Sequence, residues 1–419
     1  MTTLHVVMNG TIIGDIEGSG SRLRLRYDPT ALRREDFVPL SVNLPPTQAR
    51  WRGKPIITWL SGLLPDRAGV IHRWRAQFGI RDLHVESVLE HVGEDVAGAA
   101  QFVRPDRLET VLERKGFVEV LSDRELGDIV RAARHDMLPY DDTAAEGRFS
   151  LAGAQAKFAL QRTPDGWGLP SGAEPSTHIF KPAIPGLVDQ DVTEMVTMRS
   201  AALLGLPTAK TSISTFDGER VIGIERYDRF LVDGRWTRIH QEDLCQAAGV
   251  DPKLKYESQG GPGVAMCAAI IRRSCGDEDV RRFARSLVFN HLVRGSDAHA
   301  RNYSILLTPG EARLAPLYDL NSTLSFGERW ATHAAMRIGG EDRFDHITPT
   351  HWRQAARDMD VDPEWLCAEF RAMAERLPDV IMTVSHDDEI RDIAPMTATT
   401  LVERTSGWCA QVLRGWGPS

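Results

Sequence analysis

The sequence predicts an α+β fold of two lobes, a β-rich N-terminal lobe followed by a mainly helical C-terminal lobe. Short apolar runs joined by turn dipeptides such as Asp217-Gly218 and Asp233-Gly234 predict antiparallel strands before about residue 240. From Gln241 onward, apolar residues recur mostly with helical spacing. We therefore predict three parts: an N-terminal subdomain over 1–145, a β-rich lobe over 146–240 and a helical lobe over 241–419.

Local patterns justify the individual elements in chain order. Asn9-Gly10 lies between two apolar runs and predicts a hairpin, because a type I′ turn needs positive φ at both positions. Pro164-Asp165-Gly166 predicts a second hairpin, and Gly205 marks the end of a helix. The predicted helices are 56–64, 122–133, 191–204, 279–293 and amphipathic helices from about 350; the predicted strands are 157–162, 167–169, 177–181, 211–216, 220–232, 235–240, 303–307 and 313–318.

Composition narrows the class of protein. The chain of 419 residues is 42% apolar and 26% charged, which is ordinary for a globular protein. It shows no membrane-length apolar run and no signal-peptide pattern. Its five scattered cysteines are typical of reduced thiols, so we expect a cytoplasmic protein without membrane association. A net charge of −8 argues against a broad nucleic-acid-coating surface and leaves a local basic face open.

The segment 295–302, GSDAHARN, carries the most informative chemical pattern. Asp297 and Asn302 lie five positions apart on a loop between a predicted helix and a predicted strand. Phosphoryl transfer to a hydroxyl needs a carboxylate that takes the proton and oxygen ligands for magnesium. The kinase catalytic loop supplies them with an Asp-x-x-x-x-Asn spacing. Asp319 follows where a second metal-binding aspartate of that arrangement would lie.

Two features of the β-rich lobe indicate phosphate contacts. Small residues at 152–154 precede a strand and would let backbone N–H groups approach phosphate oxygens. Lys181 ends the strand 177–181 and would neutralise phosphate charge from there. The plainer alternatives stay open: Lys181 as a surface lysine, and Glu194 as a first-turn helix acid rather than its partner.

A metal-dependent hydrolase is a competing interpretation of the same region. His291, Asp297 and His299 would supply two imidazoles and a carboxylate to a transition metal. His291, however, lies within the apolar helix run LVFNHLV, which favours a packed core histidine. Zinc or iron in the purified protein would support the hydrolase, and a magnesium requirement with ATP turnover would count against it.

Nine blocks of the sequence resemble the HipA-like serine/threonine kinases, the toxins of HipBA toxin–antitoxin pairs. They follow one another in the family's order over roughly residues 1–330. The matching blocks are VPLSVNLP (38–45), WLSGLLPD (59–66), VAGAAQF (96–102), SLAGAQAKFAL (150–160), THIFKP (177–182), IERYDR (224–229), QEDLCQAAGVDPKLKYESQGGPG (241–263), GSDAHARN (295–302) and APLYDLNST (315–323).

The resemblance implies a two-lobed kinase-like fold, with a HipA-type N-terminal subdomain over 1–145, a nucleotide-binding lobe over 146–240 and the catalytic loop in the helical lobe over 241–419. It also implies roles for individual residues. Asp297 would be the catalytic aspartate, and Asn302 and Asp319 would hold Mg2+. Ser150 matches the serine that members of the family autophosphorylate. The residues implied to contact ATP are Ala152, Gly153, Ala154, Gln155, Lys157, Lys181, Glu225, Arg226, Tyr227, His299 and Tyr318.

The resemblance also implies partners and regulation. The expected partners are a HipB-like helix-turn-helix antitoxin, operator DNA mainly through that antitoxin, and an aminoacyl-tRNA synthetase as protein substrate, whose phosphorylation arrests growth. Phosphorylation of Ser150 would place about −1.5 to −2 charges beside a phosphate-binding loop and switch the kinase off. The alternative is a kinase-fold binding module that acts mainly as a co-repressor with the antitoxin. Intact Asp297, Asn302 and Asp319 favour the active kinase.

Overall fold

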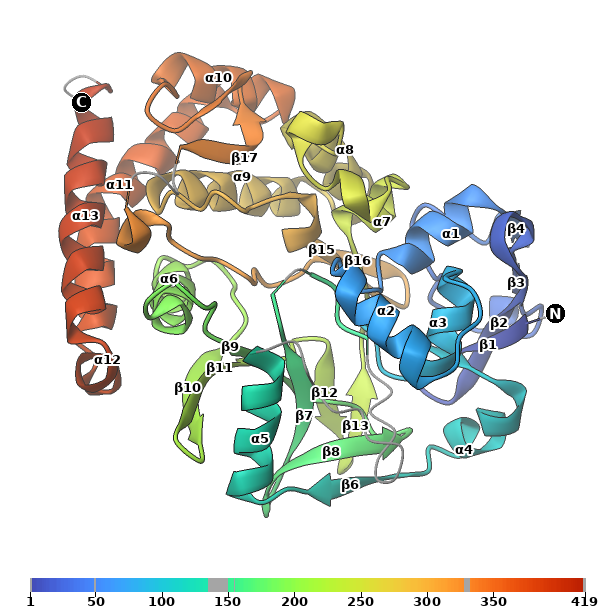
Figure 1. The fold of residues 1–419 in the computed structure, drawn as a ribbon. Coiled ribbons are helices and arrows are strands. Elements are labelled where there is room, and N and C mark those ends of the chain that lie inside the picture. Colours follow the sequence, from blue (N-terminus) through green and yellow to red (C-terminus); the bar gives the residue numbers. More distant parts are fainter. Residues whose placement is uncertain (1, 49, 135–149, 154, 328–331, 417–419) are drawn as a thin grey trace. The chain divides into compact units, whose positions relative to one another are not determined.

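The structure is a computed structural model that describes residues 2–48, 50–134, 150–153, 155–327 and 332–416 (Figure 1). Two compact units can be distinguished along the chain. The first unit comprises residues 1–182, 215–253 and 306–312; the second comprises 183–214, 254–305 and 313–419. Most strands belong to the first unit and most long helices to the second, which confirms the α+β class. None of the helices in the described ranges is long and apolar enough to cross a membrane.

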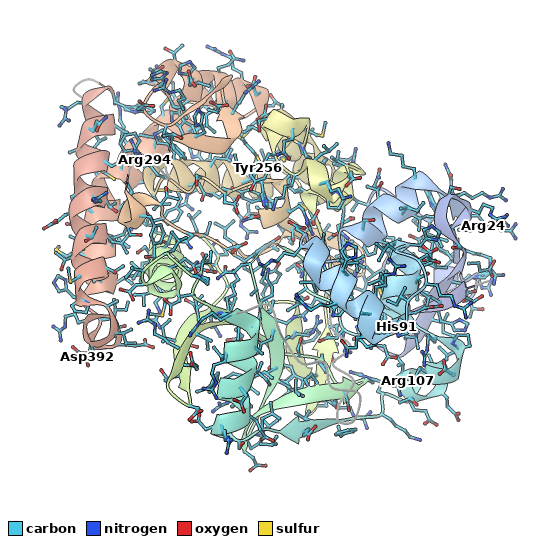
Figure 2. All side chains as sticks on the ribbon, viewed as in Figure 1. Arg24, His91, Arg107, Tyr256, Arg294 and Asp392 are labelled. Carbon is cyan, nitrogen blue, oxygen red and sulfur yellow. The ribbon has the colours of Figure 1, made fainter. Side chains whose placement is uncertain are left out.

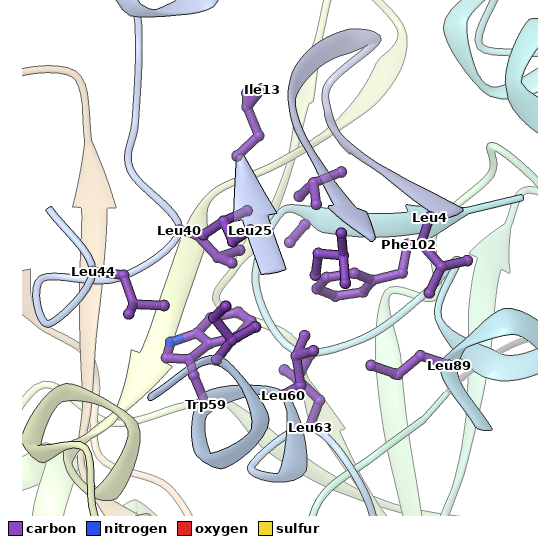
Figure 3. Close-up of a cluster of buried hydrophobic side chains, with 14 of the residues drawn as sticks. Leu4, Ile13, Leu25, Leu40, Leu44, Trp59, Leu60, Leu63, Leu89 and Phe102 are labelled. Carbon is purple, nitrogen blue, oxygen red and sulfur yellow. The ribbon is translucent and has the colours of Figure 1, made fainter. Parts of the chain in front are cut away.

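A five-stranded antiparallel sheet begins the first unit, in the order β4-β3-β2-β1-β5. Asn9 and Gly10 have φ of 48° and 82°, so the type I′ hairpin predicted there is confirmed. Figure 3 shows the core beneath this sheet, where Leu25, Trp59 and Phe102 are almost completely buried. The elements are β1 (Thr2–Met8), β2 (Thr11–Gly18), β3 (Arg24–Tyr27), β4 (Arg50–Arg52), β5 (Ala100–Val103), α1 (Lys54–Ser61), α2 (Ala68–Gln77), α3 (Val85–Val92) and α4 (Leu108–Leu112).

A second sheet of six strands follows the order β10-β11-β9-β7-β8-β6. The predicted hairpin around Pro164-Asp165-Gly166 is confirmed as β7 and β8, with Arg162 opposite Trp167. Helix α5 contributes Leu126 and Val130 to the core of this sheet. The elements are β6 (Gly116–Val120), α5 (Asp123–Arg134), β7 (Phe158–Thr163), β8 (Gly166–Gly172), β9 (His178–Pro182), β10 (Thr211–Phe216), β11 (Glu219–Glu225), β12 (Arg229–Val232), β13 (Arg235–Arg238), β14 (His240–Asp243) and α7 (Leu244–Ala248).

The strand predicted over 220–232 is wrong in one respect, because the structure breaks it between β11 and β12. Arg226 and Asp228 lie in the break, and both side chains point into a buried ion network. Arg226 Nη2 is 2.9 Å from Asp228 Oδ2, and Arg229 Nη2 is 2.9 Å from Asp95 Oδ1. Three charged side chains in four residues cannot all face inward from a regular strand, because alternate residues point to opposite faces. The chain therefore leaves the ladder here.

The second unit is built from helices around α9 and α11. Helix α11 packs against α6, α9, α10 and α13. The second strand predicted after Pro309-Gly310 is shorter than expected, because β16 ends at Leu314. Strands β15 (Ser304–Thr308) and β16 (Glu311–Leu314) form a three-stranded sheet with β14, and residues 306–312 of this hairpin belong to the first unit. The remaining elements are α6 (Gln190–Leu203), α8 (Val264–Cys275), α9 (Asp277–Leu292), β17 (His333–Ile338), β18 (Glu341–Arg343), α10 (Pro349–Asp358), α11 (Pro363–Ser385), α12 (Asp388–Ile393) and α13 (Pro395–Arg414).

His291 is a core residue of the second unit. Its ring lies within 5.7 Å, centroid to centroid, of the rings of Phe344, Trp352, Phe370 and Trp408. Neither ring nitrogen has a hydrogen-bond partner among the described residues. Burial, with a smaller contribution from Arg294, lowers the pKa of His291 to about 3. The ring is therefore neutral at physiological pH and is enclosed by aromatic side chains.

We predict that His291→Phe removes an acid-sensitive component of stability. Because the pKa of His291 is lower in the folded than in the unfolded state, stability is retained above about pH 6.5 and is lost as pH falls towards 3. Chemical denaturation at pH 7 and pH 5 should show the wild type losing about 2 kcal/mol more than the variant. The exposed His346, changed to Phe, is the control and should keep the wild-type pH dependence. Equal losses in the wild type and His291→Phe would contradict the prediction.

Candidate active site

The catalytic loop predicted at 295–302 follows the C-terminal end of α9. Gly295 N donates to the carbonyl of Asn290, 2.7 Å away, and closes the helix. Within the loop, His299 N donates to Asp297 O at 2.8 Å and Asn302 N donates to His299 O at 2.9 Å. These consecutive turns leave the Asp297 side chain exposed and the Asn302 side chain buried. The carboxylate therefore faces solvent, while the amide lies inside the unit.

Asp319 lies beside Asn302, as the spacing predicted. Asn302 Nδ2 is 3.5 Å from Asp319 Oδ2. Asp319 has φ of 58°, which is the left-handed region that a non-glycine residue occupies at a cost. Strained backbone of this kind is concentrated at functional sites, where the surrounding structure enforces it.

The segment after Asp319 is fixed to the end of α9 by two hydroxyl groups. Ser322 Oγ donates to Val293 O at 2.8 Å, and Thr323 Oγ1 donates to Arg294 O at 2.5 Å. On the other side of Asp319, Tyr318 OH donates to the carbonyl of Arg301 at 2.8 Å. Both flanks of Asp319 are therefore hydrogen-bonded to the main chain of residues 293–301, which holds the backbone at Asp319 close to the loop that contains Asp297 and Asn302.

Tyr256 is a member of this group that no sequence pattern had singled out (Figure 2). Its hydroxyl donates a short hydrogen bond to Asp297 Oδ1. Its ring packs edge-on against that of His299, with centroids 5.0 Å apart. Tyr256 lies 41 residues before Asp297 in the chain, so only the fold could reveal the contact. The sequence feature that could have drawn attention to Tyr256 is its position shortly before the Gly260-Gly261-Pro262-Gly263 turn, which does not by itself indicate a contact with Asp297.

His299 is buried, and its Nδ1 has no hydrogen-bond partner among the described residues. Burial lowers the pKa of His299 to about 4, although the Asp297 charge acts in the opposite direction. The imidazole is therefore neutral at physiological pH. A buried, unpaired nitrogen next to the catalytic loop is a polar group that a ligand could satisfy.

The oxygen groups of this site fit magnesium better than a transition metal. Asn302 and Asp319 offer an amide and a carboxylate, which are the hard ligands that Mg2+ takes alongside phosphate oxygens. In the described part of the chain, no three His, Cys, Asp or Glu side chains form a metal-binding group. With His291 enclosed by aromatic rings, the structure does not support the hydrolase alternative.

The predicted phosphate loop belongs to the first unit. Gly153 has φ of 108°, and a Cβ there would come within 2.6 Å of Lys157 Nζ. Lys157 Nζ donates to Ala152 O at 2.7 Å, and Gln155 Nε2 donates to Pro182 O at 3.0 Å. The loop is thus closed on itself and linked to the end of β9. Ala154 lies outside the described residues.

Ser150, the predicted autophosphorylation site, is almost completely buried. Its hydroxyl donates to Leu63 O at 2.8 Å and its N–H donates to Asp95 O at 3.0 Å. Gly153 O accepts from Asp66 N at 3.2 Å, so the segment from Ser150 to Gly153 lies along residues 63–66. The Ser150 hydroxyl is closed to solvent in this arrangement.

The other residues predicted to contact ATP have different environments. Lys181 is buried on β9, and Glu225 is exposed at the end of β11. Tyr227 OH donates to Gln241 Oε1 at 2.6 Å. Arg226 donates through its side chain to Asp228, Ser176 Oγ and Val96 O. That gives Arg226 a structural role, and its contact with ATP stays a prediction, as do those of Lys181, Glu225 and Tyr227.

Comparisons with known proteins agree with this arrangement of motifs. Residues 4–103 match the HipA N-terminal domain, and residues 149–381 match the HipA-like C-terminal domain. The candidate kinase Y4mE of Sinorhizobium fredii is 32% identical over 376 residues, which cover 85% of this chain and 86% of Y4mE. The serine/threonine-protein kinase toxin HipA of Shewanella oneidensis is 27% identical over 404 residues, which cover 91% of this chain and 89% of that toxin.

The fold has a solved counterpart. HipA of Shewanella oneidensis, in a complex with HipB and operator DNA, matches with a TM-score of 0.82 at 23% identity, over 99% of this chain and 100% of that chain. The match to the HipA-like C-terminal domain covers more than half of the 419 residues. On this evidence, the chain belongs to the HipA-like kinase family, as the motifs predicted.

Proposed function

We propose that this protein is an ATP- and magnesium-dependent serine/threonine kinase that acts as the toxin of a toxin–antitoxin pair in the cytoplasm. The observation that carries the proposal is the group formed by Asp297, Asn302 and Asp319. Its members have kinase catalytic-loop spacing, and hydrogen bonds on both sides of Asp319 fix them in one unit. A binding module would have no use for this arrangement.

In the proposed reaction, Asp297 orients the acceptor hydroxyl and takes its proton. Its side chain is exposed, so a serine or threonine of a substrate can reach it. Tyr256 donates to Oδ1 of Asp297, which leaves Oδ2 for the acceptor. A hydrogen bond to a charged group is worth about 1.5–3 kcal/mol. Tyr256 is therefore a positioning residue, which holds the carboxylate in one orientation.

Asn302 and Asp319 are the residues that would hold magnesium on the ATP phosphates. When bound, the metal ion neutralises the charge that develops on the transferred phosphoryl group. The proposed phosphate contacts from the first unit are Lys181 and the loop from Ala152 to Lys157. The loop favours such contacts because Gly153 lets the main chain approach a ligand closely.

The toxin role and its partners rest on family membership. The relative from Shewanella oneidensis is named a kinase toxin, and its solved complex contains HipB and operator DNA. We propose that this chain likewise pairs with a HipB-like antitoxin, reaches operator DNA mainly through it, and phosphorylates an aminoacyl-tRNA synthetase. Growth arrest would follow from stalled translation.

Ser150 is proposed as the site of self-inactivation. Its hydroxyl faces the carbonyl of Leu63, and its N–H is bonded to the carbonyl of Asp95. A phosphate group carries about −1.5 to −2 charges. It cannot occupy the buried position of the Ser150 hydroxyl, because the group that faces it there is a carbonyl oxygen, which repels a negative charge. Phosphorylation therefore requires the segment around Ser150 to move away from Leu63 and Asp95, and the phosphate then prevents its return.

We predict that Asp297→Asn abolishes phosphoryl transfer. The amide keeps the shape of the carboxylate but cannot take a proton, so the rate should fall by about 10² to 10⁴. The wild type with ATP and Mg2+ should gain phosphate by intact mass, and chelation of the metal should stop it. Asp392→Asn, at an exposed position of α12, is the control. A phosphorylated Asp297→Asn protein would refute the assignment, and an unmodified wild type would favour the binding module.

Tyr256→Phe is predicted to lower kcat about 10-fold, from loss of a hydrogen bond to a charged group. The KM for ATP should be unchanged, because the ring and the proposed metal ligands remain. Steady-state kinetics on a peptide acceptor measure both constants. Tyr27→Phe loses a hydroxyl that bonds to Leu44 O in the first unit, and serves as the matched control. An unchanged kcat, or an effect confined to KM for ATP, would rule out the positioning role.

Ser150→Ala should abolish self-phosphorylation and leave the kinase active towards other substrates. Peptide mapping after incubation with ATP and Mg2+ locates the phosphate, and a peptide assay before and after incubation follows activity. The wild type should lose activity with time, whereas Ser150→Ala should keep it. The control Ser122→Ala, at an exposed serine, should behave as the wild type. A phosphate mapped to another residue would overturn the assignment of Ser150.

A further inference from the structure

The outer face of strands β3 and β4 carries four arginines in two opposed pairs. Arg24 lies opposite Arg52, and Arg26 lies opposite Arg50. All four side chains are exposed, because the alternate residues of the two strands, such as Leu25, face the core. Figure 2 labels Arg24 in this group. We call these four residues the arginine ladder.

The neighbouring pair of strands has the opposite arrangement. Across β2 and β3, Glu17 lies opposite Arg24 and Asp15 lies opposite Arg26. Asp15 Oδ2 is 2.8 Å from Arg26 Nη2, and Asp15 also bonds to His5. The sheet therefore pairs acid with base on one side of β3 and base with base on the other. Positive charge accumulates towards β4, which ends the sheet.

Protection of a sheet edge does not by itself explain the ladder. Charged side chains do protect edge strands from pairing with other chains. Like charges directly opposite each other, however, destabilise a sheet, and one acid on β4 would protect the edge without that cost. Asp15 and Glu17 compensate the charge of Arg26, and Glu17 faces Arg24. On β4, Arg50 and Arg52 face only arginines, and neither forms an ion pair among the described residues of a chain whose net charge is −8. Two arginines that oppose pairing of the strands and have no acid across from them point to a ligand.

We propose that the arginine ladder binds the phosphate backbone of duplex DNA directly. This site goes beyond the proposed kinase function and does not depend on it. Guanidinium groups bind phosphate oxygens in a bidentate manner, and arginine is the residue best suited to that geometry. Successive pairs on a strand are two residues, or roughly 7 Å, apart, so the ladder presents a repeated array of charges to a repeated array of phosphates.

The composition of the surface favours DNA over an acidic protein. Protein interfaces depend on buried aromatic or apolar anchors and have few charges at their centre. None of the large exposed hydrophobic side chains of the described chain lies on β3 or β4. Protein–DNA interfaces are more polar and much more positive than protein–protein interfaces. The four exposed arginines of the ladder match the composition of a protein–DNA interface rather than that of a protein–protein interface.

The test compares two triple variants of the full chain. The ladder variant carries Arg24→Gln, Arg50→Gln and Arg52→Gln; the control variant carries Arg81→Gln, Arg124→Gln and Arg235→Gln, at exposed positions elsewhere in the first unit. Both lose three positive charges. Binding to a 30-bp duplex of arbitrary sequence is measured by fluorescence anisotropy between about 50 and 200 mM salt, over which phosphate-binding proteins weaken steeply.

We expect the wild type and the control variant to bind with the same dependence on salt. The ladder variant should lose affinity, and its plot of log K against log salt should become less steep by about 2.7, or about 0.9 for each lost phosphate contact. Its thermal midpoint should not fall, because the substitutions relieve repulsion between opposed arginines. A lower midpoint with unchanged binding would show a structural role for the ladder and overturn the proposal.

Three other outcomes also overturn the proposal. These are no binding by the wild type, equal weakening of the ladder and control variants, and displacement of the duplex by polyglutamate of equal charge at equal concentration. The last result would identify the ladder as a general acceptor of acidic chains, including acidic proteins. Arg52→Glu gives an independent check, since it restores an acid opposite Arg24, and it should both raise the midpoint and weaken binding to DNA.

Discussion

The first unit depends on a buried network in which the carboxylates of Asp95 and Asp228 face the guanidiniums of Arg226, Arg229 and Arg238. Burial and the neighbouring guanidiniums lower the pKa of Arg238 to about 9. Burial acts to raise the pKa of Asp228, but Arg226 and Arg229 outweigh it and hold that pKa well below its usual value. Removing one partner of such a network leaves a buried charge and costs about 3–5 kcal/mol. The main-chain carbonyl of Asp95 also holds Ser150, so the same residue fixes both the network and the segment of the proposed switch.

The sequence contained enough information for the elements that depend on local geometry. Asn9-Gly10 predicted its hairpin because the turn requires positive φ, and the helical pattern over 279–293 with the apolar run 303–307 predicted the loop between them. The break at Arg226 was not predictable, because its cause is Asp95, about 130 residues away in the chain. Likewise, no spacing relates Tyr256 to Asp297. Interactions between distant segments define these features, and a single sequence does not state them.

The candidate site combines two kinds of stabilisation. In the second unit, serine, threonine and tyrosine hydroxyls fix the backbone that flanks Asp319 to the end of α9 and to Arg301. In the first unit, the loop before β7 forms hydrogen bonds within itself, and Lys157 Nζ donates to the carbonyl of Ala152. The loop before β7 must rearrange if Lys157 binds a phosphate instead of the Ala152 carbonyl. The backbone around Asp319 can stay as it is when a ligand binds. Rigidity is thus concentrated where the proposed chemistry requires orientation.

The left-handed backbone at Asp319 restricts what evolution or mutagenesis can place there. Glycine, asparagine and aspartate occupy this conformation most readily, whereas glutamate would retain the charge but meet the steric cost of a longer side chain at φ of 58°. Among these three residues, only aspartate carries a carboxylate for the proposed metal. The backbone conformation favours a short side chain at this position and the proposed ligand role requires a carboxylate, and aspartate meets both conditions.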